Sequence, residues 1–131
     1  MTTKEVAKQA KMSQQAISRW ARIGLVKTDR RGNRTIFGPE AAQECIVIAR
    51  MVRAGLWGEF ADWPDSRMPD EGPPAIIKRA LTVLRRDRDI CMLCVLGTTV
   101  HAIAWGSESG WQFENDVQMF SIVVLIAVPG I

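Results

Sequence analysis

The fold of the N-terminal half is decided by residues 13–37, SQQAISRWARIGLVKTDRRGNRTIF. Ser13 is a residue type that often caps helix N-termini, and the residues after it place apolar side chains at helical spacing. This spacing predicts a helix over about residues 14–23 that buries Ala16, Ile17 and Trp20. Gly24 can end the helix in a left-handed conformation, after which the chain returns to the core.

A shorter helix is expected before this one. Thr2 or Thr3 can cap its N-terminus, and residues 11–12 supply the turn that follows it. Small side chains at the expected contacts let two short helices approach closely, as a helix-turn-helix unit requires. These small residues are Ala7, Ala10 and Ala16.

A basic hairpin and a third helix are expected next. Gly32-Asn33 suits a tight turn, and residues 35–37 (Thr-Ile-Phe) favour an extended strand. Arg30, Arg31 and Arg34 surround the turn, which is the arrangement needed by a wing that straddles a phosphate backbone. The third helix begins at residues 38–40 (Gly-Pro-Glu), with proline in its first turn, and Gly55 ends it. Its expected buried stripe is Ala42, Cys45, Ile46, Ala49 and Val52.

The polar side chains of these elements are suited to DNA. The major groove of B-DNA admits one α-helix, whose side chains can contact base edges, while flanking Lys and Arg hold phosphates. The candidates for base readout are Gln14, Gln15, Ser18 and Arg19. The other DNA-binding candidates are Ser13 at the helix start, Asn33 at the hairpin tip, and Lys4, Arg22, Lys27, Arg30, Arg31 and Arg34 for phosphates.

Charge divides the chain into two halves. Residues 1–56 hold eleven Lys and Arg against four Asp and Glu, a net charge of +7. Residues 57–131 hold six Lys and Arg against ten Asp and Glu, a net charge of −4. The whole-chain net charge of +3 therefore conceals a strongly basic N-terminal half. A basic surface raises the affinity for polyanions of any sequence. A solvated basic surface without a partner is the alternative interpretation.

The N-terminal sequence resembles the winged helix of mercury-resistance-regulator (MerR) type transcription factors. The resemblance covers about the first 56 residues. It rests on Thr-Lys-Glu-Val-Ala, Ser-x-x-Ala-Ile with Trp20, Gly-Leu-Val, the arginine-rich wing, Phe37 and the ending Arg-x-x-Arg-Ala-Gly-Leu. It implies a sequence-specific regulator of transcription that binds double-stranded DNA. In such a regulator the second helix enters the major groove, the wing grips the backbone, and a dimer binds a near-palindrome.

The chain also departs from that family. Ser18 stands where the family often has Arg, and Arg34-Thr35 stands where its wing commonly has aromatic and Arg residues. The family's long antiparallel dimerisation helix is not evident. Because the same fold serves phage excisionases and small terminase subunits, a phage-type architectural DNA-binding factor is the alternative function. A module whose basic half binds an acidic protein is a further alternative.

The remaining sequence predicts a linker and a second unit, which makes the whole fold α+β. Residues 57–74 are acidic and proline-rich, as is typical of a linker or an ordered loop. The aromatic side chains of this segment, Trp57, Phe60 and Trp63, are expected to pack against one of the domains. Residues 75–131 predict one amphipathic helix, over about 75–88, followed by antiparallel strands within 90–96, 99–105 and 119–128. The last run is apolar at nearly every position, so we expect it to be buried on both faces.

This second unit is expected to be an oligomerisation domain. One helix can cover only one face of its sheet, so a partner chain is the natural cover for the other, which gives a homodimer or a higher homo-oligomer. Its apolar runs are shorter than the ~20 residues that span a bilayer, so no membrane partner is expected.

No pattern predicts an enzyme, a metal site or a cofactor. Cys91 and Cys94, with His101 nearby, would lie on opposite faces of a strand, and no further pair completes four metal ligands. Three cysteines, an odd number, fit a reducing compartment, and no signal peptide is visible. We therefore expect a cytoplasmic protein.

Overall fold

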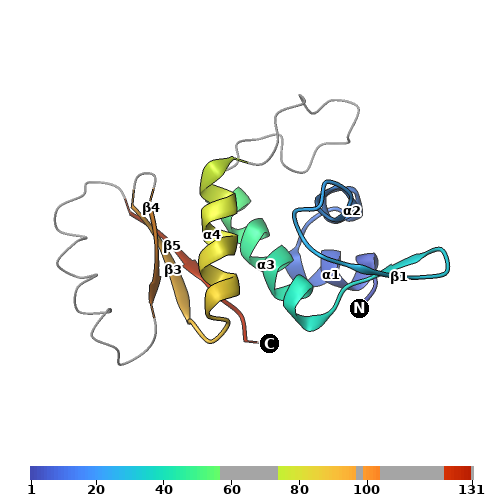
Figure 1. Ribbon diagram of the computed structural model, residues 1–131. Helices are drawn as coiled ribbons and strands as arrows, with labels where there is room; N and C mark the ends of the chain where they lie inside the picture. The colour runs from blue at the N-terminus through green and yellow to red at the C-terminus, as the bar shows by residue number, and fades with distance from the viewer. Residues whose placement is uncertain (57–73, 97–98, 104–122, 131) are drawn as a thin grey trace.

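The computed structural model describes residues 1–56, 74–96, 99–103 and 123–130 (Figure 1). The fold mixes helices with two antiparallel sheets, as the sequence predicted. In chain order its elements are α1 (Thr3–Ala10), α2 (Gln14–Arg22), β1 (Asp29–Arg31), β2 (Arg34–Ile36), α3 (Pro39–Arg53), α4 (Ala75–Arg86), β3 (Met92–Leu96), β4 (Thr99–Ile103) and β5 (Val123–Ala127).

The two N-terminal helices begin where the sequence places their caps. The Thr2 side chain accepts a hydrogen bond from the Glu5 amide, and the Ser13 side chain accepts one from the Ala16 amide at 3.1 Å. Between the helices, Lys11 takes a left-handed conformation with φ 56° and makes the expected turn. The predicted helix-turn-helix is therefore confirmed in its local geometry, with α2 ending one residue before the expected position.

Trp20 is the largest side chain of the N-terminal core and is fully buried. Ala16 and Ile17 are also fully buried, so the predicted inner face of α2 is confirmed. After α2, Gly24 has φ +78°, which favours glycine, and the chain returns to the core at Leu25 and Val26.

Helix α3 lies at the centre of the molecule. The sequence predicted one buried stripe, but nine of its fifteen residues are buried. Two members of the predicted stripe, Ile46 and Val52, are only half-buried, whereas Gln43 and Glu44 are buried. The single-stripe prediction was wrong because α1 packs on one side of α3 while α4 and β5 pack on the other.

The C-terminal strands form a three-stranded antiparallel sheet in the order β4-β3-β5. Leu93 stands opposite Ala102 on one neighbouring strand and Ile126 on the other. Figure 1 shows α4 and α3 between this sheet and the N-terminal helices, with the β1–β2 hairpin projecting on the far side. One continuous hydrophobic core joins the two halves of the chain, from Val6 to Ile126.

Within the single chain, only one face of the last strand is covered, and the predicted cover by a partner chain stays a prediction. Ile126 is buried, but Leu125, on the opposite face of β5, is 51% exposed. Within the described residues, β5 is an edge strand of a sheet that α3 and α4 pack against.

Several predictions lie outside the described residues. They are the packing of Trp57, Phe60 and Trp63, and the ends of the two strands predicted to extend into 104–105 and 119–122. The domain boundaries at 56 and 75 also stay predictions, because residues 57–73 are not described.

Candidate nucleic-acid interface

Helix α2 presents a polar surface opposite its buried face. Gln14, Gln15, Ser18 and Arg22 are exposed. Ser13 is exposed as well, but its hydroxyl oxygen already accepts the hydrogen bond that caps the helix. Only its hydroxyl proton remains free to donate to a ligand such as a phosphate oxygen.

Arg19 departs from the position predicted for it. The sequence placed it on the exposed face of α2, yet the residue is half-buried and its Nε atom is shielded from solvent. Residue 19 lies beside Trp20, at the edge of the face that packs into the core. Helical spacing alone did not predict this partial burial of Arg19.

The predicted hairpin is present. Strands β1 and β2 pair in antiparallel register from Asp29↔Ile36 to Arg31↔Arg34, which leaves Gly32 and Asn33 as a two-residue turn. Gly32 has φ +63° while Asn33 has a negative φ, the pattern of a type II′ hairpin turn. The side chains exposed on this hairpin include Arg30, Arg31, Asn33 and Arg34.

The start of the chain anchors the base of the hairpin. Thr2 forms an isolated antiparallel bridge with Ile36. The Met1 amino group donates to the Phe37 carbonyl at 2.8 Å, and the Phe37 amide donates back to the Met1 carbonyl at 2.7 Å. These bonds fix the hairpin against the N-terminus of α1.

A cleft of about 420 Å³ opens between α1 and the hairpin. It brings together two predicted phosphate ligands from distant parts of the sequence, Lys4 and Arg34, with Asn33 at its rim. Its other lining residues are Thr2, Thr3 and Thr35. Thr2 and Thr3 adjoin Lys4 in the sequence, but sequence reasoning missed the cleft because only the folded hairpin brings Thr35 and Arg34 to them.

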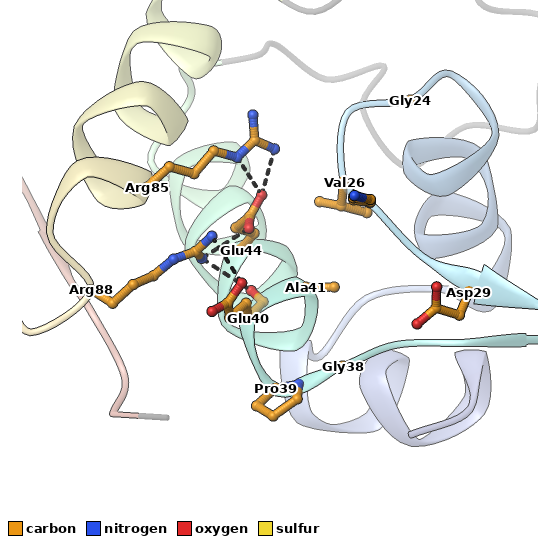
Figure 2. Close-up of a pocket in the computed structure, with 11 residues that line it drawn as sticks. Gly24, Val26, Asp29, Gly38, Pro39, Glu40, Ala41, Glu44, Arg85 and Arg88 are labelled. Carbon is orange, nitrogen blue, oxygen red and sulfur yellow. Dashed lines mark hydrogen bonds and ion pairs between the residues drawn. The ribbon is translucent and has the colours of Figure 1, made fainter.

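Lys27 lies elsewhere, in a groove of about 950 Å³ between the α2–β1 connection, the start of α3 and α4. Figure 2 shows Gly24, Val26 and Asp29 on one side of this groove and Glu40, Glu44, Arg85 and Arg88 on the other. The structure therefore separates Lys27 from the cleft that holds Lys4 and Arg34.

Two arginines of the basic half have side chains that bond to the protein's own backbone. Arg53 donates to the Ala10 carbonyl at the end of α1, at 2.7 Å. Arg50 donates to the Ala127 carbonyl on β5, at 2.6 Å. Their side chains already bond to the protein's own backbone, although the net charge of +7 counts both.

The cysteines show no arrangement for metal binding or nucleophilic catalysis in the described part of the chain. None of the three is in a disulfide, and no cluster of three or more His, Cys, Asp and Glu residues that could hold a metal occurs there. Cys94 stands opposite His101 in the sheet, whereas Cys91 precedes β3. Burial, reinforced by the nearby Glu44 charge, raises the pKa of the Cys45 thiol to about 12. At neutral pH that thiol is therefore protonated and a poor nucleophile.

Comparison with known proteins identifies the N-terminal part of the chain. No match was found among curated proteins or among solved structures. In the described residues, no helix is both long enough and apolar enough to cross a membrane. Residues 1–56 match the family model described as "MerR HTH family regulatory protein". This segment is therefore a MerR-type helix-turn-helix DNA-binding domain.

Proposed function

We propose that this protein is a sequence-specific, double-stranded DNA-binding regulator of transcription in which α2 enters the major groove. The observation that carries the proposal is the division of α2 into two faces. Ala16, Ile17 and Trp20 anchor one face in the core, which leaves Gln14, Gln15 and Ser18 exposed on the other. Glutamine and serine side chains of this kind form hydrogen bonds with base edges.

The β1–β2 hairpin is the proposed wing. Arg30, Arg31 and Arg34 are exposed, and none of their side chains forms a hydrogen bond or ion pair with another described residue. Their charges are therefore available to phosphates. Lys4 would add a second cation in the cleft beside Arg34, while Ser13, Arg22 and Lys27 are the other proposed phosphate ligands. Asn33 would shape the tip.

Arg19 keeps a proposed role in base readout, now with its stem packed at the edge of the core. A half-buried stem restricts the side chain to fewer conformations, so less entropy is lost when the guanidinium meets a base. The test compares Arg19→Ala on specific and random DNA. We expect a loss of about 1–3 kcal/mol on specific DNA only. Equal losses on both would exclude base readout by Arg19.

Dimerisation through residues 75–131 is also proposed, and the geometry of β5 supports it. The Val128 amide donates to the Cys91 carbonyl, so in antiparallel pairing the backbone groups of Leu125 and Ala127 point away from β3. Arg50 holds the Ala127 carbonyl, and among the described residues no strand pairs with this edge. A second β5 paired antiparallel here would give a two-fold axis, as an inverted DNA repeat requires.

The deciding experiment is selection of bound duplexes from a random DNA pool at about 150 mM salt, where non-specific attraction is weakened. An enriched inverted repeat is the expected result, and its spacing would report the distance between the two α2 helices. The absence of any enriched motif would contradict sequence-specific regulation. DNA bending without a motif would instead favour the phage-type architectural factor. Three cysteines without a disulfide among them support a reducing, cytoplasmic setting for this function.

A further inference from the structure

One side chain of the C-terminal segment contacts two parts of the DNA-binding domain at once. Arg85, in the last turn of α4, donates through Nε to the Glu44 carboxylate of α3 at 2.9 Å. Its Nη2 atom donates to the Leu25 carbonyl at 2.7 Å and also to Glu44. Figure 2 shows the guanidinium and Glu44 facing each other across the seam between α4 and α3.

Glu44 gives this contact its strength. Its side chain is only 5% exposed, so the carboxylate must be compensated inside the protein. Arg85 supplies one partner, and Arg88 supplies the other through Nη1 at 2.9 Å. Arg88 also reaches Glu40, and its carbonyl accepts a hydrogen bond from Gln43. Several directional bonds therefore fix the C-terminal end of α4 to α3.

The contact between Arg85 and Leu25 links α4 to the DNA-binding elements. This residue lies in the short connection between α2 and β1, so it joins the proposed recognition helix to the proposed wing. Its side chain is buried, and its amide donates to the Trp20 carbonyl at 3.0 Å. The carbonyl of the same residue is the group that Arg85 holds. A displacement of α4 therefore acts on the point from which both DNA-contacting elements extend.

We propose that Arg85 is a positioning residue for DNA binding. By holding Glu44 and the Leu25 carbonyl together, it makes the placement of α2 relative to the hairpin depend on α4. The segment that carries α4 and the sheet thereby sets the geometry of the DNA interface. A change in α4 when that segment assembles with a second chain would therefore alter the placement of α2 relative to the hairpin. The inference rests on the proposed DNA-binding function and adds a residue from outside residues 1–56.

The chain offers a matched control for this proposal. Arg86 follows Arg85 on α4, is exposed, and forms no hydrogen bond or ion pair with another described residue. Arg85→Met and Arg86→Met therefore remove the same charge from neighbouring positions and weaken long-range attraction to DNA equally. Methionine keeps most of the length of the aliphatic stem and removes the guanidinium. Only Arg85→Met breaks the link to Leu25.

The experiment measures the dissociation constants of the full-length variants, each confirmed as folded by circular dichroism. The probes are the duplex most enriched from the random pool and a random-sequence duplex of equal length. We expect Arg85→Met to weaken binding to the enriched duplex about tenfold more than Arg86→Met does. The two variants should bind the random duplex equally. Equal losses for both variants on both duplexes would overturn the positioning role.

Two further variants separate positioning from direct contact with DNA. Glu44→Gln changes a buried side chain that cannot touch DNA, yet it should also weaken binding to the enriched duplex selectively. Its effect should not add to that of Arg85→Met, because both act through one contact. Arg85→Lys keeps the charge but lacks the planar fork, so it should not restore binding. Full restoration by Lys, or an additive double variant, would overturn the inference.

DNA binding by the wild-type protein separates a failure of the proposed function from a failure of the proposed role of Arg85. A wild-type protein that binds neither duplex would overturn the proposed function and this inference together. A wild-type protein that selects the enriched duplex, combined with an Arg85→Met variant that does the same, would overturn the inference alone.

Discussion

The hairpin of residues 29–36 and the seam between α3 and α4 are both rich in arginine, but they use it in opposite ways. In the hairpin, Arg30, Arg31 and Arg34 are exposed, and their side chains bond to no other described residue. In the seam, Arg85 and Arg88 both bind the buried Glu44 carboxylate. One set of guanidinium groups is available to a ligand, while the other maintains the fold.

This difference shows why net charge alone identifies no binding surface. Arg50 and Arg53 contribute to the +7 of the N-terminal half, yet both donate to backbone carbonyls of the protein itself. Conversely, the half with net charge −4 contains Arg85, which contacts the DNA-binding domain. Availability of a charge depends on its bonds and its exposure.

The largest effect is expected at the seam, from Glu44→Ala. The substitution leaves two arginines without their buried partner, and we expect the free energy of unfolding to fall by about 3 kcal/mol. This value is at the lower end for broken buried pairs because Arg85 is 45% exposed and can be rehydrated. Urea denaturation measures the change. Arg31→Ala, in the hairpin, should change stability by no more than about 0.5 kcal/mol. Similar losses for both variants would contradict the distinction between the two regions.

The local elements could be predicted from the sequence because short-range signals determine them. Ser13 as a cap, Gly24 with its left-handed φ and the turn at Gly32 each follow from the chemistry of a few adjacent residues. Strand positions were also predictable from runs of β-branched residues. The surroundings of α3 were not, because burial on its second side depends on α4 and β5, which are distant in sequence.

The candidate DNA interface was also predictable only where local sequence patterns determine it. Sequence patterns found the polar face of α2 and the arginines of the hairpin, since exposure follows from helical spacing and from the turn. They missed the half-buried position of Arg19 and the cleft that brings Lys4 to Arg34. They also missed the contacts of Arg85, because its partners Glu44 and Leu25 are 41 and 60 residues away. No local pattern reports such a contact.

A smaller effect is expected at the hairpin turn, from Gly32→Ala. Gly32 has φ +63° and an added Cβ would meet nothing within 4 Å, so the cost is backbone strain alone. We expect a loss of about 1 kcal/mol in the free energy of unfolding. Gly130→Ala is the control, since that glycine also has open space but lacks a positive φ in this range. An unchanged stability for Gly32→Ala would show that the hairpin tip does not contribute to the cooperative fold.

Arg31→Ala should have a smaller effect, and one on DNA binding rather than on stability. Loss of one exposed phosphate contact should weaken binding by roughly 0.5–1 kcal/mol on every DNA sequence. The slope of log K against log salt concentration should become shallower by about 0.9, the value for one phosphate. Titrations at several salt concentrations measure both quantities. A loss confined to one sequence would assign Arg31 to base readout and would remove the simple contrast with the seam.

The smallest effect is expected at Cys45, which adjoins Glu44 on α3. Because its pKa is raised to about 12, the thiol stays protonated from pH 7 to pH 9, and full burial excludes a reagent as well. Iodoacetamide should therefore label Cys45 negligibly over this range, as measured for each cysteine by mass spectrometry of digested protein. The half-buried Cys91 should be labelled first, and unfolding in urea should expose all three cysteines. Labelling of Cys45 at the rate of Cys91 in the folded protein would mean that the α3 core opens readily. Such opening would make the seam as accessible to solvent as the hairpin and would remove the difference between the two regions.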